Sequence, residues 1–233
     1  SLGLLILVLS LIAARRRPLG TGSIIVGATL VGASIPLYIG QHYVPAAVLA
    51  LAAELILLFG VVRTPGGDAS RLATITLMVV VFQGLLGMWT VTWLLKPIVV
   101  TAHLMGGLAT FSLLTWLAFA STPNSGLVQA VAPKLRRMLW IGLGLLIVQI
   151  ALGGWTSSNY AALACGSDFP KCQGEWWPAR DFREAFVLWR GIGVDYEGGV
   201  LDGPARVAIQ LAHRVVAVLV FGHLGMAAVR MFR

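Results

Sequence analysis

The chain has 233 residues, of which 58% are hydrophobic and 11% are charged, and its formal net charge is +8. Soluble domains carry about 25% charged residues, so this composition excludes a soluble globular protein and predicts an integral membrane protein. Long apolar runs between short polar links predict helices, because the strands of a membrane barrel would alternate polar and apolar residues. The basic residues lie at the ends of apolar runs, so the positive charge does not indicate a nucleic-acid partner.

Seven apolar segments follow one another along the chain and predict about seven transmembrane helices. They run over residues 2–14, 22–40, 45–62, 72–93, 98–120, 138–160 and 204–230. The first is too short for a membrane crossing, which needs about 20 residues, and the chain begins at Ser1 without a methionine. We therefore expect a fragment of a longer, all-α integral membrane protein.

Basic residues mark one side of the predicted bundle. They gather at residues 15–17, in the linkers 63–71 and 121–137, and at the C-terminal end. Counting membrane crossings puts all of them on the same side, which the positive-inside rule identifies as cytoplasmic. The long loop 161–203 then lies on the outer side of a cell inner (plasma) membrane, which the chain crosses several times.

The long loop 161–203 contains a candidate interfacial helix. Asp181 is placed to cap it, and Phe182, Phe186 and Trp189 would then share one face. Aromatic side chains on one face are typical of a segment that lies at the membrane surface. The alternative is an aromatic-rich loop that packs on the bundle, and either arrangement covers the outer end of the helices.

One stretch of sequence occurs twice. Gln, Leu, Gly, Trp and Thr recur in register at residues 83–90 and 149–156. Each copy is followed by an apolar segment with an Ala-His pair, which places His103 after the first copy and His213 after the second. A helix pair that returns with the same landmarks indicates a duplicated bundle.

The repeated histidines are candidates for chemistry because ionisable side chains inside a membrane are rare and functional. His103 and His213 lie at similar depths below the outer ends of their helices. This placement suits axial ligation of a haem iron by neutral imidazole, and the alternative is hydrogen bonding between helices. His42 lies in an outer turn, where we expect an interfacial residue. His223 lies on a different helix face from His213, toward the cytoplasmic half.

Four further residues are candidates for the chemistry of the site. Arg214 either pairs with haem propionates or extends to the outer interface. Cys165 and Cys172 lie in the outer loop, where an oxidising compartment predicts a disulfide, structural or redox-active, against the alternative of free thiols. Glu54 is a carboxylate within a membrane segment, and it is either a proton-relay group or a protonated acid bonded to a neighbouring helix.

Taken together, these motifs resemble those of the heme A synthase family. The resemblance rests on QGLLGMWTVT (83–92), LKP (95–97), TAHL (101–104), LGGWTSS (152–158), the loop 165–178 and AHR (212–214), and it covers roughly residue 72 to the C-terminus. It implies a pseudo-symmetric pair of four-helix bundles with eight helices, each holding a haem between two histidines near the outer face.

The resemblance also implies cofactor, substrate and reaction. Haem b would be the cofactor of the C-terminal bundle, bound through His213, and haem O the substrate of the N-terminal bundle, bound through His103. The implied reaction oxidises a methyl group of haem O to a formyl group and so makes haem A for terminal oxidases. Cys165 and Cys172 match the position of the family's outer-loop disulfide.

Parts of the family pattern have no counterpart in the chain. The first helix, the first histidine and the carboxylate before it are absent, so the catalytic residue is unknown, and the last two helices are also absent. The predicted domains are a partial N-terminal bundle (1–120) with an inserted hairpin (22–62), a cytoplasmic linker (121–137) and a partial C-terminal bundle (138–233). Because each bundle holds one histidine of its pair, we expect the isolated chain to be inactive.

Two other functions remain open at this point. A b-type haem-binding membrane protein for electron transfer would share the histidine pattern, whereas a transporter or assembly factor would use the histidines structurally and bind no haem. The expected partners are haem O, haem A and membrane lipid. Heme O synthase, an electron donor and a second copy of the chain in a homo-oligomer are further candidates.

Overall fold

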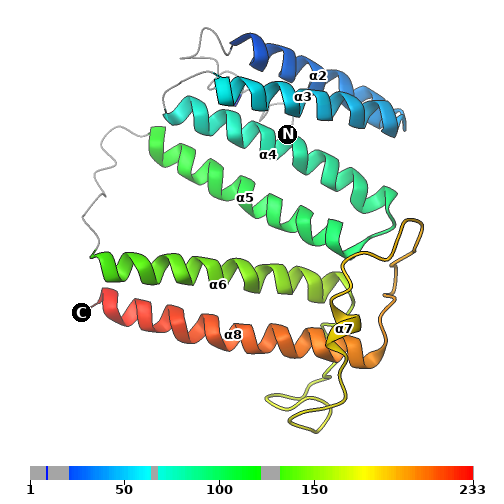
Figure 1. Cartoon of the computed structure of the whole chain (residues 1–233), viewed down its shortest axis with the longest axis vertical. Coiled ribbons are helices and arrows are strands. Elements are labelled where there is room, and N and C mark those ends of the chain that lie inside the picture. Colours follow the sequence, from blue (N-terminus) through cyan, green and yellow to red (C-terminus); the bar gives the residue numbers. More distant parts are fainter. Residues whose placement is uncertain (1–8, 10–20, 64–67, 122–131, 233) are drawn as a thin grey trace. The chain divides into compact units, whose positions relative to one another are not determined.

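The computed structural model is all-helical over the residues it describes, which are 9, 21–63, 68–121 and 132–232 (Figure 1). Its helices are α2 (Thr21–Ile39), α3 (Tyr43–Arg63), α4 (Asp68–Thr92), α5 (Pro97–Ser121), α6 (Pro133–Ser158), the single-turn α7 (Phe182–Ala185) and α8 (Gly203–Met231). All except α7 are long and apolar enough to cross a membrane. This confirms the predicted class of multi-pass helical membrane protein. The first predicted segment, 2–14, lies almost entirely outside the described residues.

Two helices begin earlier than the apolar pattern predicts. α4 begins at Asp68 rather than at residue 72, and α6 begins at Pro133 rather than at residue 138. The added turns contain charged residues, which can belong to a helix without being apolar, so hydropathy misses them. Proline in the first turn of α6 removes an N–H that would have no partner within the helix. α5 begins at Pro97, one residue before the predicted segment 98–120.

The described residues form two compact units. The first contains α2, α3, α4 as far as Met88, and α5 from Gly106 onward. The second contains the turn between α4 and α5 with the adjoining helix ends, together with α6, α7 and α8. The predicted division at 121–137 follows the sequence duplication instead, and it remains a prediction.

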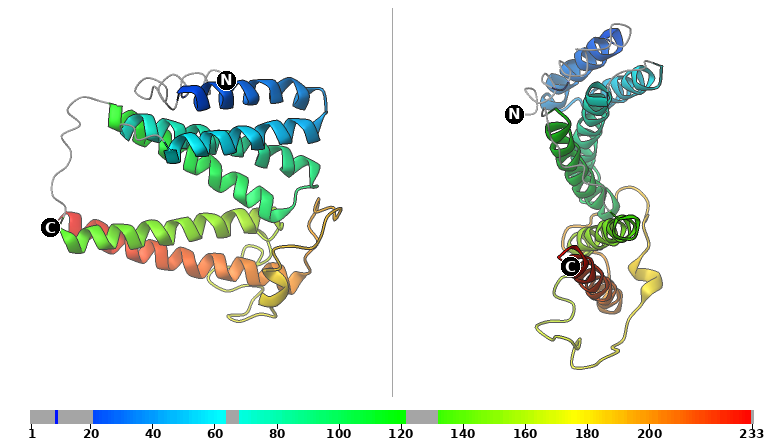
Figure 2. Two further views of the ribbon diagram at one scale, coloured as in Figure 1. Left: turned by 45° about the horizontal axis from the view of Figure 1, so that its top comes forward. Right: turned by 90° about the vertical axis from the view of Figure 1, so that its left-hand side faces the viewer.

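In the first unit, α2 and α3 form an antiparallel hairpin (Figure 2). A Cβ added to Gly27 would lie 2.8 Å from Cγ of Leu57, and one added to Gly60 would lie 2.9 Å from Cβ of Ser23. Glycine therefore allows a close approach at both contacts, as is common between membrane helices. The hairpin corresponds to the helix pair predicted over residues 22–62.

In the second unit, α6 and α8 run antiparallel and lie side by side (Figure 1). A Cβ added to Gly142 would lie 2.8 Å from Cδ2 of Leu224, and one added to Gly153 would lie 3.4 Å from Cε1 of His213. Later residues of α6 therefore face earlier residues of α8, as expected for an antiparallel pair. This register places the second copy of the repeat opposite the second histidine.

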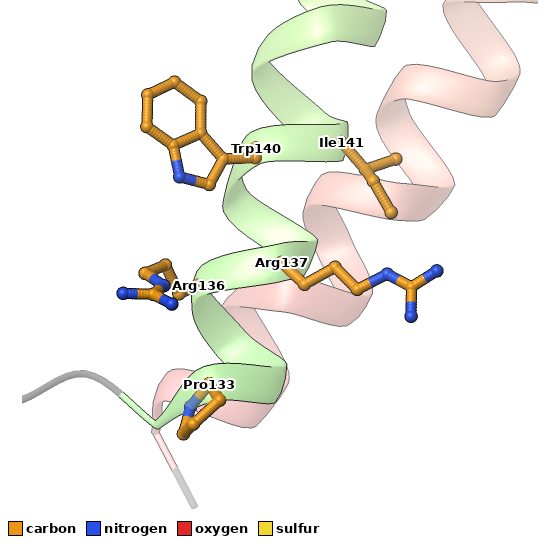
Figure 3. A pocket seen from close by; sticks show the side chains of 5 residues that line it. All are labelled: Pro133, Arg136, Arg137, Trp140 and Ile141. Atoms are coloured by element: carbon orange, nitrogen blue, oxygen red, sulfur yellow. The ribbon is translucent and has the colours of Figure 1, made fainter.

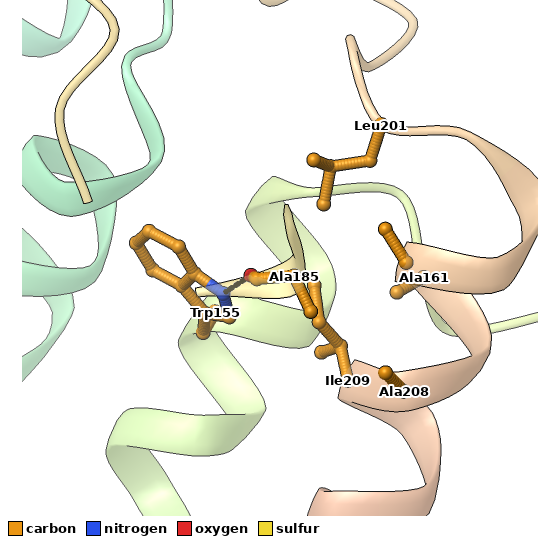
Figure 4. Close-up of a cluster of buried hydrophobic side chains, with 7 residues drawn as sticks. Trp155, Ala161, Ala185, Leu201, Ala208 and Ile209 are labelled. Atoms are coloured by element: carbon orange, nitrogen blue, oxygen red, sulfur yellow. Dashed lines mark hydrogen bonds between the residues drawn. The ribbon is translucent and has the colours of Figure 1, made fainter. Parts of the chain in front are cut away.

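A buried cluster joins the end of α6 to α7 and to the start of α8 (Figure 4). Its members are Trp155, Ala161, Ala185, Leu201, Ala205, Ala208 and Ile209. The indole Nε1–H of Trp155 donates a hydrogen bond to the backbone carbonyl of Ala185 at 2.9 Å. The long loop is therefore held on the helix pair by apolar packing and by a satisfied indole N–H.

The predicted helix in the long loop is shorter than expected. Asp181 caps it as predicted, because its carboxylate accepts two backbone N–H groups of the first turn at 2.9 and 3.0 Å. The helix nevertheless ends at Ala185, so Phe186 and Trp189 do not continue a helical face, and that prediction is wrong. The carbonyl of Ala185 instead accepts the indole of Trp155, and the chain turns away after it.

Candidate functional site

α8 carries the second of the repeated histidines. The carboxylate of Asp202 caps the helix by accepting the backbone N–H of Ala205 at 2.9 Å. His213 lies almost three turns further on, and its imidazole is half-buried. The amide Nε2 of Gln149 on α6 lies 3.1 Å from the ring Nδ1 and 3.3 Å from the ring Nε2. The Gln that opens the second copy of the repeat therefore contacts the histidine that follows it.

The disulfide loop (residues 165–172) lies against the same stretch of α8. Cys165 and Cys172 are bonded with an S–S distance of 1.99 Å, which confirms the predicted disulfide. Both are buried and pack against Val207 and Leu211, the latter two residues before His213. The disulfide therefore fixes a loop beside the histidine rather than at a distance from it.

Arg214 holds this loop through a contact that the sequence did not suggest. Its Nη1 donates to the backbone carbonyl of Lys171 at 2.9 Å, and its guanidinium carbon lies 5.7 Å from the ring centroid of Phe169. The sequence offered only a propionate or the interface as its partner. One hydrogen bond uses one of five guanidinium N–H groups, so an anionic ligand remains compatible with this arrangement.

His103 lies on the part of α5 that belongs to the second unit, where His213 also lies. This part of α5 packs on α6: a Cβ added to Gly154 would lie 3.0 Å from Cδ2 of Leu104 and 3.2 Å from Cγ2 of Thr101. His103 lies between these two residues in the sequence, and its side chain is half-buried. Both repeated histidines therefore lie on helices that pack against α6.

Sequence reasoning missed a buried lysine in the α4–α5 turn. Lys96 is only 1% exposed, its ammonium lies 3.5 Å from the ring centroid of Trp189 and 5.5 Å from that of Trp93, and it donates to the carbonyl of Gly191. A lysine is almost never buried unless it is paired, and cation–π contact with two indoles supplies part of that pairing. The sequence signal was the LKP motif itself, which lies at the end of a membrane helix.

A backbone contact and a buried tyrosine accompany Lys96. The N–H of Tyr196 donates to the carbonyl of Leu94 at 3.2 Å, so the long loop is bonded to the α4–α5 turn. Burial raises the pKa of the Tyr196 phenol above its ordinary value, and the positive charge of Arg190 opposes that rise. Leu94 and Leu95 both have positive φ, at 51° and 58°. We name this contact region, Lys96 with residues 189–196, the lysine clamp.

The other ionisable candidates lie outside this region. The Nε2–H of His223 donates to the backbone carbonyl of Met138 at 2.9 Å, which is a hydrogen bond between α8 and α6. His42 is exposed in the turn between α2 and α3. Glu54 is half-buried in α3, and its Oε1 has no hydrogen-bond partner among the described residues.

A shallow surface hollow lies at the beginning of α6 (Figure 3). It is lined by Pro133, Arg136, Arg137, Trp140 and Ile141. Arg136 and Trp140 lie on one side of the helix, and Arg137 and Ile141 lie on the other. The hollow lies near the end of α6 opposite to His213 and contains no imidazole or carboxylate, so it is not a candidate for the repeated-histidine site.

The residues around His213 fit a haem iron. Ligation requires a neutral imidazole nitrogen in a weakly hydrated setting, and His213 supplies one on an apolar helix. Gly153 presents no side chain to the ring, and a Cβ added there would lie in ordinary contact with Cε1. The Oε1 of Gln149 is buried without a hydrogen-bond partner among the described residues. Groups of three or more His, Cys, Asp or Glu suited to another metal ion are not found in the same residues.

The chain matches the protein family described as Cytochrome oxidase assembly protein (COX15-CtaA) over residues 39–233. It belongs to this family. The match includes both repeated histidines, the disulfide loop and the lysine clamp, and it begins just before α3, within the predicted inserted hairpin 22–62. The resemblance predicted from the motifs is therefore confirmed.

A named relative is also similar to the chain. The heme A synthase of Shewanella oneidensis (strain MR-1) is 42% identical over 175 residues, which is 73% of this chain and 51% of the relative. The chain therefore spans about half the length of the curated relative that it matches. No solved structure matches the chain.

Proposed function

We propose that this chain forms part of a heme A synthase, an oxidoreductase that converts a methyl group of haem O to a formyl group to make haem A. The observation that supports this most directly is His213, a half-buried imidazole held between the repeated glutamine and a glycine of α6. The family assignment and the relative named heme A synthase support the reaction.

In this proposal the two repeated histidines bind haem iron. His213 ligates haem b, the resident cofactor, and His103 ligates the substrate haem O. A bound haem would supply the redox chemistry of the reaction at its iron. The chain's own residues bind and orient it: the imidazoles hold the iron, and the apolar helices limit access by water.

Arg214 and the disulfide loop form the polar edge of this site. The guanidinium of Arg214 pairs with a haem propionate while it keeps its hydrogen bond to Lys171. The bond between Cys165 and Cys172 holds the loop in place for this contact. The lysine clamp holds the second half of the long loop on the α4–α5 turn, two turns before His103.

In the same proposal, the protein lies in the cell inner membrane with the long loop 161–203 on the outer side. Charge supports this orientation, since basic residues gather at the opposite ends of the helices. Haem O and haem A are the proposed ligands, heme O synthase and an electron donor are proposed partners, and a homo-oligomer is the proposed assembly.

The test is co-expression of the natural gene product with heme O synthase in cells that lack their own heme A synthase. Extracted pigments are identified by chromatography and by reduced-minus-oxidised spectra. We expect haem A in the wild type and none in His213→Ala or His103→Ala. Haem b without haem A would favour an electron-transfer cytochrome, and a folded protein without haem would overturn the proposal in favour of a structural role for the histidines.

A further inference from the structure

A glutamine in an apolar membrane helix needs a polar partner, because the lipid interior offers none. Gln149 lies in the middle of α6 and directs its amide at the imidazole of His213. The corresponding Gln83 in the first copy of the repeat also crosses to the neighbouring helix, where a Cβ on Gly106 of α5 would collide with its Oε1. Position 1 of each copy therefore reaches the histidine-bearing helix.

The distances do not decide which atoms of Gln149 and His213 donate and which accept. Nε2 of Gln149 lies 3.1 Å from Nδ1 and 3.3 Å from Nε2 of His213, so it is committed to neither ring nitrogen. Its Oε1 is buried and has no hydrogen-bond partner among the described residues. A half-turn of the amide exchanges oxygen and nitrogen with little change in shape. It brings the unpaired acceptor to the ring.

An acceptor at Nδ1 decides which tautomer the imidazole adopts. If Oε1 accepts a hydrogen bond, Nδ1 carries the proton and the lone pair lies on Nε2. Histidines that bind metals commonly use one ring nitrogen for the metal and donate the other N–H to a carboxylate or carbonyl oxygen, which also raises their basicity as ligands. The exchange gives the buried Oε1 a donor at the ring and turns the amide N–H₂ to the position that Oε1 held. With the proton on Nδ1, the lone pair of Nε2 is then left for a metal.

We propose that Gln149 is a positioning residue: its Oε1 accepts the Nδ1–H of His213 and so directs Nε2 of that histidine to a haem iron. This proposal rests on the proposed haem ligation by His213. Gly153 lies one turn further along α6, where a Cβ would be 3.4 Å from Cε1 of His213, so the ring also lies close to the α6 backbone.

Two substitutions separate this role from packing. Gln149→Leu keeps the branched shape but removes the acceptor, and Gln149→Glu keeps the shape and strengthens the acceptor. The matched control is Gln210→Leu, which changes another half-buried glutamine, on α8, that makes no described contact with His213. The experiment uses the full-length protein in detergent, with haem b as the added probe.

Haem b titration and redox potentiometry are the first readouts. We expect Gln149→Leu to bind haem b about 10–100-fold more weakly, the range seen when such supporting groups are removed. We expect the reduction potential of the bound haem to rise in Gln149→Leu and to fall in Gln149→Glu, because a stronger acceptor makes the imidazole a better donor to oxidised iron. Gln210→Leu is expected to match the wild type.

A haem-free readout keeps the inference testable on its own. The tautomer of His213 can be read by NMR in protein with ¹⁵N-labelled histidine, where the signal that disappears in His213→Asn belongs to this residue. We expect the Nδ1–H tautomer in the wild type and a mixture of tautomers in Gln149→Leu. Haem binding that depends on His213 but is unchanged in both Gln149 variants would overturn this inference and leave the proposed function intact. No haem binding by the wild type would overturn both.

Discussion

His213 and His223 lie on one helix, yet their side chains have different partners. The ring of His213 lies against the side-chain amide of Gln149, which has both a donor and an acceptor group. The Nε2–H of His223 instead donates to the backbone carbonyl of Met138. A ring nitrogen that already serves a neighbouring helix is satisfied and has a structural role. Hydrogen bonding between helices, the alternative considered for His103 and His213, is thus what the structure shows for His223.

The contrast between these two histidines predicts different losses on substitution. His223→Leu removes one hydrogen bond between helices, so we expect stability to fall by about 1 kcal/mol while haem b content stays at the wild-type level. His213→Ala is expected to lose the haem. Pyridine haemochrome per mole of protein, with thermal denaturation of the same samples, measures both. Equal haem loss in the two variants would contradict the assignment.

Trp155 offers a second test at the scale of one hydrogen bond. Trp155→Phe keeps an aromatic ring in the buried cluster but leaves the carbonyl of Ala185 without its donor. We expect a loss of about 1–3 kcal/mol, the cost of an unpaired buried polar group. Trp140→Phe on the same helix is the control, because Trp140 is 68% exposed. Chemical denaturation followed by circular dichroism compares the two, and similar destabilisation would argue against the hydrogen bond.

At the scale of elements, the lysine clamp joins two segments that are far apart in the sequence. The α4–α5 turn adopts left-handed backbone at Leu94 and Leu95, a conformation that costs a non-glycine residue about 1 kcal/mol or more. Such a turn persists because other contacts hold it. Here the contacts are the buried ammonium of Lys96 and the hydrogen bond from Tyr196.

Loss of the clamp charge is expected to loosen the long loop without unfolding the helices. Lys96→Met keeps the length of the side chain but removes the ammonium that lies on Trp189 and bonds to Gly191. We expect faster amide hydrogen exchange over residues 189–196, most clearly at Tyr196, by mass spectrometry. Lys171→Met, which changes an exposed lysine of the same loop, serves as the control. Unchanged exchange in Lys96→Met would show that the clamp does not restrain the loop.

At the scale of the whole molecule, the six long helices alternate in direction through the membrane if each crosses it once. The three helix-to-helix links at 40–42, 93–96 and 159–202 then fall on one side. Seven of the nine acidic residues of the chain lie in the third of these links. Basic residues gather at the other helix ends, so the charge distribution has two distinct sides.

This topology predicts opposite behaviour of reporters fused at two positions. Alkaline phosphatase, which is active only outside the cytoplasm, is expected to be active when fused after residue 190 and inactive when fused after residue 126. A cytoplasmic fluorescent reporter at the same positions is expected to show the reverse. The same activity from both positions would contradict the assignment of the long loop to the outer side.

The sequence alone determined the class of the protein and the places of its helices. Apolar runs of membrane length have no other stable form in lipid, since every backbone group must be bonded within the segment. The repeated motif likewise singled out His103 and His213 as candidate site residues and indicated the family. Residue types that recur in register can be recognised from the sequence alone. The two cysteines of the long loop also predicted the disulfide, which the structure contains.

Only the tertiary structure decided what these residues touch. Hydropathy contains no information about partners: the amide of Gln149 on His213, the carbonyl of Lys171 on Arg214 and the buried Lys96 all depend on register between distant segments. The carbonyl at the end of the short α7 likewise accepts the indole N–H of Trp155, a partner from a distant segment. The beginnings of α4 and α6 were also predicted too late in the sequence. Their first turns contain charged residues, which can be helical but do not contribute to an apolar run.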